Sequence, residues 1–168
     1  MKNHEIIKRI SPELREKILR SLWKEEKEVY KTAVSSLAPQ YNVRPVFVLQ
    51  KLPADRDRWL ANALARKTSE MITGNVLQIW LAATHKEMFI DFLDTLNIPH
   101  DENGLVDELP DSPPREELEK AIQVLLEKYP TEEVALYLHA FDAMDEGAWK
   151  DLPLILQENE QLRLPEPA

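Results

Sequence analysis

The sequence predicts an all-α fold, either a compact multi-helix bundle or a short stack of helical hairpins. Only 3 of the 168 residues are glycine, whereas an all-β chain needs glycine-rich turns at short intervals. Apolar residues recur near helical spacing along most of the chain, and prolines or short polar stretches separate these segments. With 43% hydrophobic residues, the chain is expected to form a single domain over residues 1–168.

The N-terminal helical part is expected to span residues 5–97. Ser11 precedes Pro12, so a hydroxyl that can cap a helix stands before a residue suited to the first helical turn. Apolar residues then follow at helical spacing until Pro39 limits the segment. These features predict one long first helix from Ser11 to the region of Pro39.

Further helices are expected in the rest of this part. A short helix is predicted at 46–51, and a third helix is predicted to start at Pro53 and to end near Gly74. Residues 76–92 are the most apolar segment of the sequence, and we expect the run 75–96 that contains them to be the most buried. They form either one helix or two helices that meet near Thr84, because periodicity alone does not distinguish the two.

Residues 98–113 form an acidic, proline-rich connector. The pair Asn103 and Gly104 favours a tight turn with positive φ, which predicts a small β-hairpin or an ordered loop near residues 98–109. An EF-hand is excluded, because a register with Gly104 as the sixth residue places prolines at the first and twelfth positions, where calcium needs acidic ligands.

The C-terminal part, residues 114–160, is predicted to be a helical hairpin followed by a short last helix after Asp151. Two apolar stripes separated by Pro130 indicate the hairpin. The stripes consist of Leu118, Ile122, Leu125, Leu126 and Tyr129, and of Val134, Leu138, Phe141 and Met144. Residues 115–145 do not match the tetratricopeptide or ankyrin consensus, so no repeat family is indicated.

Several classes of function are excluded by missing residues or motifs. The chain has no cysteine, which rules out disulfides, thiolate zinc sites and cysteine nucleophiles and is compatible with a reducing compartment. It contains no dinucleotide fingerprint, P-loop or serine-nucleophile motif, and no cofactor is expected. Neither a signal peptide nor a membrane span is recognisable, so we expect a cytoplasmic protein without a membrane contact.

Charge is distributed unevenly along the chain. Residues 1–84 carry 15 basic and 9 acidic side chains, a net of +6, whereas residues 85–168 carry 6 basic and 21 acidic side chains, a net of −15. This asymmetry favours a non-enzymatic protein-protein interaction domain with an acidic C-terminal surface that attracts a basic partner. The residues expected on this surface are Glu116, Glu117, Glu119, Glu127, Glu132 and Glu133.

Two alternative functions remain open at the sequence level. A metal-assisted hydrolase would use His85 or His100 with nearby carboxylates, although the E-x-x-H pairs of di-metal bundles do not occur. His139 is a further candidate for a functional pocket. A nucleic-acid-associated protein would use the basic residues of the first half, but the acidic second half repels phosphate, so nucleic acid is an unfavoured partner. The basic residues are Arg44, Lys51, Arg56, Arg58, Arg66 and Lys67.

Overall fold

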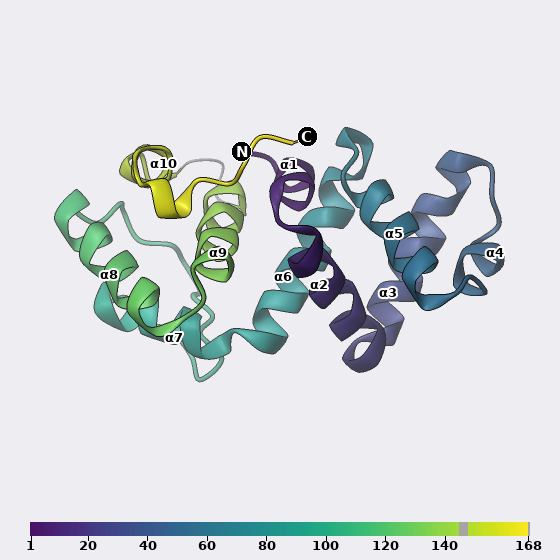
Figure 1. Cartoon of the computed structure of the whole chain (residues 1–168). Helices are drawn as coiled ribbons and strands as arrows, with labels where there is room; N and C mark the ends of the chain where they lie inside the picture. Colours follow the sequence, from purple (N-terminus) through teal and green to yellow (C-terminus); the bar gives the residue numbers. More distant parts are fainter. Residues whose placement is uncertain (145–147, 168) are drawn as a thin grey trace. The chain divides into compact units, whose positions relative to one another are not determined.

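The computed structural model describes residues 1–144 and 148–167. These residues form ten α-helices, three short 3-10 helices and no strand, which confirms the predicted all-α class. None of the described helices combines the length and the apolar character that a membrane crossing requires. The chain divides into an N-terminal unit, residues 2–80 with 165–168, and a C-terminal unit, residues 81–164 with residue 1 (Figure 1). The single domain over residues 1–168 stays a prediction.

The N-terminal unit is built from short helices with tight connections. It contains α1 (Asn3–Arg9), α2 (Pro12–Glu25), α3 (Lys27–Leu37), η1 (Ala38–Tyr41), α4 (Pro45–Leu49), α5 (Pro53–Leu64), η2 (Lys67–Ser69) and most of α6 (Glu70–Thr84). The start of α2 is confirmed, because the Ser11 hydroxyl accepts a hydrogen bond from the Leu14 backbone N–H at 3.1 Å. The short helix predicted at 46–51 corresponds to α4.

The single long first helix that the sequence predicts is wrong. The helix breaks at Glu26, whose φ of −134° and ψ of 50° are not helical, and α2 and α3 lie on either side of it. The break changes the direction of the chain, so that Leu22 from α2 and Tyr30 from α3 are both buried. The sequence also gave no sign of α1, whose seven residues are too few for helical periodicity to be recognised.

The predicted end of the third helix near Gly74 is also wrong. Helix α5 ends at Leu64, and α6 runs through Gly74. Two side-chain hydroxyl groups satisfy backbone carbonyls at the C-terminal end of α5. The Ser69 hydroxyl donates to the Ala63 carbonyl and the Thr73 hydroxyl donates to the Leu64 carbonyl, each at 2.7 Å. A Cβ atom at Gly74 would lie 2.9 Å from Asn3 Nδ2, so this glycine permits close approach of α1.

The C-terminal unit confirms the predicted hairpin and last helix. It contains α7 (Lys86–Thr95), α8 (Arg115–Lys128), α9 (Thr131–Met144), α10 (Asp151–Glu158) and η3 (Glu160–Leu162). Helices α6 and α7 meet at His85, whose φ is −125° and ψ is 30°, so the two-helix alternative is confirmed. In the core, the Phe92 ring lies 5.7 Å from Tyr137 and 5.8 Å from Phe141, between centroids.

The connector is an ordered loop, and the β-hairpin alternative is wrong, since none of its residues is in a strand. Asp101 Oδ1 accepts hydrogen bonds from the backbone N–H groups of Asn103 and Leu105, at 2.8 and 2.9 Å. Gly104 has the predicted positive φ, 74°. The Asp101 carboxylate thus satisfies two backbone donors of the turn, and the Asp101 N–H donates to the Leu105 carbonyl at 2.9 Å, so the loop is ordered by its own hydrogen bonds.

Candidate functional site

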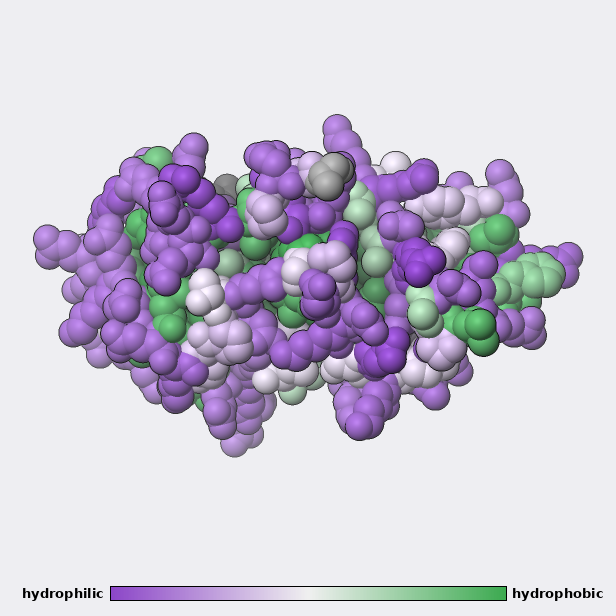
Figure 2. Space-filling view, viewed as in Figure 1, coloured by the Kyte–Doolittle hydropathy of each residue, from purple (hydrophilic) through white to green (hydrophobic). Residues whose placement is uncertain are grey.

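An apolar surface surrounds α4 in the N-terminal unit. Four large apolar side chains are exposed within ten residues, and we call them the α4 patch: Val43, Val46, Phe47 and Leu52. Phe47 is 60% exposed and Leu52 is 72% exposed. In Figure 2 a hydrophobic area lies over α4 at the right of the view. Exposed apolar residues of this size in one short segment are typical of contact surfaces.

Local sequence explains why α4 stands at the surface with these side chains outward. Asn42 adopts the left-handed conformation with φ of 55°, which ends η1 and turns the chain toward α4. Pro45 and Pro53 then begin α4 and α5, so the helix between them is limited to five residues. Such a short helix buries one side chain well, Val48, and leaves its other apolar residues at least partly exposed.

Two basic side chains flank α4 in the sequence and lie between residues of the α4 patch. Arg44 precedes α4 and Lys51 follows it, and both are exposed. The patch itself has no titratable group, so it offers contact area and no acid-base chemistry. Its chemical character is therefore that of an apolar binding surface whose segment also carries two positive charges.

The predicted acidic surface lies on α8 only. Glu116, Glu117 and Glu127 are exposed, and Glu119 is exposed but pairs with Arg115 at 2.8 Å. Glu132 is only partly exposed. Because Glu133 is buried, the fully exposed residues of the predicted acidic surface all lie on one helix of the hairpin.

The prediction that Glu133 faces outward is wrong. Its side chain is 5% exposed, and its Oε1 atom lies 3.4 Å from His85 Nε2. The reason is that residues 133–140 of α9 are all buried, so that part of the helix has no solvent-facing side. The uncharged run from Val134 to Phe141 is the sequence signal that could have indicated this burial.

One residue of the predicted basic surface is also buried. Arg56 is 6% exposed, its guanidinium carbon lies 3.5 Å from the centroid of the Trp23 ring, and its Nε donates to the Tyr30 hydroxyl at 3.3 Å. Arg56 is therefore used inside the unit and is not available to phosphate. The other five predicted basic residues are exposed: Arg44, Lys51, Arg58, Arg66 and Lys67.

The candidate histidines lie in separate places. His100 Nε2 is 2.7 Å from Asp94 Oδ1, and the Asp101 carbonyl followed by the Asp94 carboxylate raises the pKa of His100. His85 lies beside Glu133, and His139 Nε2 is 2.8 Å from the Leu162 carbonyl oxygen. Across residues 1–144 and 148–167, no three histidine or acidic side chains gather in a group that could hold a metal ion.

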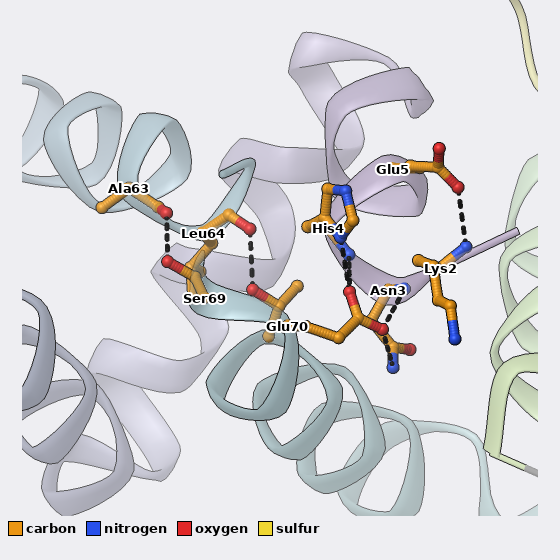
Figure 3. A network of polar contacts seen from close by, with 9 residues as sticks. Lys2, Asn3, His4, Glu5, Ala63, Leu64, Ser69 and Glu70 are labelled. Carbon is orange, nitrogen blue, oxygen red and sulfur yellow. Dashed lines mark hydrogen bonds and ion pairs between the residues drawn. The ribbon is translucent and has the colours of Figure 1, made fainter. Parts of the chain in front are cut away.

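A polar network attaches α1 to α6. Glu70 accepts hydrogen bonds from the backbone N–H groups of Asn3 and His4, at 2.8 and 3.0 Å, and from the Asn3 side chain (Figure 3). Burial acts to raise the pKa of Glu70, but the hydrogen bonds from His4 and Asn3 outweigh it and hold this pKa below its usual range. The Glu70 carboxylate thus satisfies backbone N–H groups in the first turn of α1, which is a structural role.

No protein-family model matches the chain, and no curated protein or solved structure matches it either. Function is therefore inferred from the surfaces and clusters described above. Among these, the α4 patch is a feature that stabilisation of the fold does not explain, because exposed apolar side chains contribute little to a core.

Proposed function

We propose that the protein is a non-enzymatic interaction domain that binds another protein through the α4 patch. The observation that carries this proposal is the exposure of Phe47 and Leu52 on and beside one short helix. Aromatic side chains are enriched in protein interfaces, and burying each of these residues would contribute about 1.5–3 kcal/mol before the costs of association.

The charges around the patch indicate the chemistry of the partner. Arg44 and Lys51 belong to the same segment as the patch and are exposed, and residues 1–84 carry a net charge of +6. A partner that presents apolar side chains between carboxylates would match both features. Its charges would mainly speed association, whereas its apolar side chains would slow dissociation.

Selection of peptides from a random display library on the immobilised protein tests this proposal. We expect the selected peptides to combine aromatic or large aliphatic residues with Asp or Glu. The double variant Phe47→Ala, Leu52→Ala should weaken their binding by about tenfold or more, because both apolar contacts are lost. Titration calorimetry measures this change directly.

A matched control replaces an exposed apolar side chain outside the patch. Met71 on α6 is 84% exposed, so Met71→Ala should leave the affinity unchanged. Unchanged melting temperatures would show that all variants fold. The proposal is contradicted if the selected peptides lack apolar residues, or if the double variant binds them as well as the unchanged protein does.

We propose a second contact surface, for a basic partner, on the acidic face of α8 that carries Glu116, Glu117 and Glu127. Glu116 and Glu117 make no hydrogen bond or ion pair through their side chains within the described part of the chain, and Glu127 is also exposed.

Replacing Glu116, Glu117 and Glu127 by lysine should abolish salt-sensitive binding of lysine-rich peptides. Reversal of Glu13 and Glu16 on α2 serves as the control. If both sets of variants behave alike, the face contributes only to solubility.

A further inference from the structure

Asp57 on α5 is the acceptor in a buried polar cluster of the N-terminal unit. Its side chain is 7% exposed, and its Oδ1 atom accepts the Tyr30 hydroxyl hydrogen bond at 2.6 Å. Burial, and then the neighbouring Asp57, raise the pKa of Tyr30, so this hydroxyl keeps its proton and donates it at neutral pH. One oxygen of the carboxylate is therefore fully engaged.

The other oxygen of Asp57 has an unused capacity to accept hydrogen bonds. Its Oδ2 atom is buried and receives no hydrogen bond from any described residue. Arg20 Nε forms an ion pair with Oδ2 at 3.8 Å, which is beyond hydrogen-bond distance, and the guanidinium of Arg20 also pairs with Glu16 at 3.0 Å. Leaving such an acceptor without a donor costs about 1–3 kcal/mol, so a donor brought to Oδ2 would be stabilised there.

Asp57 lines a groove between α2 and α5 whose volume is about 370 Å³. That volume lies within the range of small-molecule sites in proteins. Apolar residues from both helices contribute to its walls: Pro12, Leu19, Ala54 and Ala61. Both helices belong to the N-terminal unit, so the groove is formed within one unit.

The groove also holds a cation that lacks a partner. Arg15 lines it, and its side chain makes no hydrogen bond or ion pair with the residues that the structure describes. By contrast, the two other arginines of the groove, Arg20 and Arg58, are paired with Glu16 at 3.0 Å and with Asp55 at 3.7 Å. One groove thus contains an unused acceptor and an unused positive charge.

We propose that this groove binds a small zwitterion of the amino-acid type, with its ammonium group on Asp57 Oδ2 and its carboxylate on Arg15. The ammonium N–H supplies the missing donor, and the exposed side chain of Arg20 moves aside to admit it. A simple anion would leave Asp57 Oδ2 without a hydrogen-bond donor, and a simple amine would leave Arg15 unpaired. This binding site is separate from the α4 patch and does not depend on it.

Titration of the full chain, followed by NMR shifts of backbone amides, tests the proposal. The probes are glycine, β-alanine, 4-aminobutyrate and 5-aminovalerate, in which the distance between the two charges increases, with butylamine and butyrate as singly charged controls. We expect one zwitterion to bind about tenfold more tightly than either control and to shift the amides around Arg15 and Asp57. Equal or absent binding of all probes up to about 10 mM would overturn the proposal.

Substitutions in the groove test which residue binds the carboxylate of the zwitterion and which binds its ammonium group. Arg15→Gln and Asp57→Asn should each weaken the best zwitterion by about tenfold or more, whereas Lys24→Gln, an exposed change elsewhere on α2, should leave the affinity unchanged. Arg15 is partly exposed, so its variant is expected to fold even if Asp57→Asn disturbs the buried cluster. An Arg15→Gln protein that binds the zwitterion like the unchanged protein would overturn the proposal.

Discussion

Tyr30 and Tyr129 both donate a hydroxyl hydrogen bond to a carboxylate, but their surroundings differ. Tyr30 is fully buried, and the Asp57 side chain that it serves is 7% exposed. Tyr129 is only partly buried, and its acceptor Asp91 also pairs with Lys128 at 2.8 Å. A buried carboxylate depends on each donor more strongly, because water cannot replace the one that is lost.

At the scale of single residues, we therefore expect Tyr30→Phe to lower the free energy of unfolding by about 1–3 kcal/mol. Tyr129→Phe should lower it by less than about 1 kcal/mol, because Lys128 and water still satisfy Asp91. Urea unfolding of both variants measures the difference. Similar losses for the two tyrosines would show that the Asp57 cluster is not short of donors.

Single-residue burial is also where the sequence predictions failed. Arg56 and Glu133 were expected at the surface, because charged side chains are seldom buried unless they are paired. Their partners are remote in the sequence: Trp23 and Tyr30 for Arg56, and His85 for Glu133. Such pairs are created by tertiary packing. The apolar run after Glu133 could have indicated its burial, but no local pattern identifies the partners of either residue.

At the scale of elements, α1 depends on its attachment to Glu70. A helix of seven residues is not stable in isolation, because the first turn costs more free energy than its few hydrogen bonds return. Glu70 offsets this cost by accepting hydrogen bonds from two backbone N–H groups at the helix start. Ile6 and Ile7, both buried, add apolar contact.

We expect Glu70→Gln to lower the free energy of unfolding by about 1 kcal/mol at neutral pH, because the charged acceptor is lost from the helix start. The pKa of Glu70 is lowered in the folded protein, so its contribution is complete above the unfolded pKa of about 4.3 and disappears as the pH falls through the folded pKa.

Urea unfolding at neutral pH and at stepwise lower pH measures this dependence. The difference between the unchanged protein and Glu70→Gln should narrow below about pH 4, since both then carry a neutral side chain at this position. A difference that stays constant on acidification would show that the charge of Glu70 does not stabilise α1.

Elements were predictable where a local signal decides them. Ser11 before Pro12 marked the start of α2, and the two apolar stripes marked the hairpin of α8 and α9. The break at Glu26 and the passage of α6 through Gly74 were missed. In both places tertiary packing outweighs local preference, because the break lets two helices share a core and the glycine admits Asn3.

At the scale of the whole molecule, the sequence indicated the charge asymmetry and the exposed glutamates of α8, but not the α4 patch. The α4 patch was missed because Val46 and Phe47 look like core residues in the sequence, and only the length of α4 places them outside. The unequal charge of the two halves is nevertheless a property of the sequence itself, and it has consequences for stability that do not depend on any partner.

The last prediction concerns that charge. Residues 85–168 carry 21 acidic and 6 basic side chains, so mutual repulsion destabilises this part of the chain at low ionic strength. Raising NaCl from about 0.01 M to about 0.1 M shortens the screening length from about 30 to about 10 Å. We therefore expect hydrogen exchange of the α8 backbone amides to slow with salt, after correction for the exchange rates of unstructured peptides.

Helix α2 is the internal control for this measurement, because the N-terminal half carries 15 basic and 9 acidic side chains and has less repulsion to screen. Exchange in α2 should change little over the same range of salt. Faster exchange in α8 with added salt would mean that attractive ion pairs, such as the one between Arg115 and Glu158, outweigh the repulsion among the acidic residues. In that outcome the acidic residues stabilise the C-terminal unit through pairing, and the acidic face of α8 would have to be counted as part of the fold.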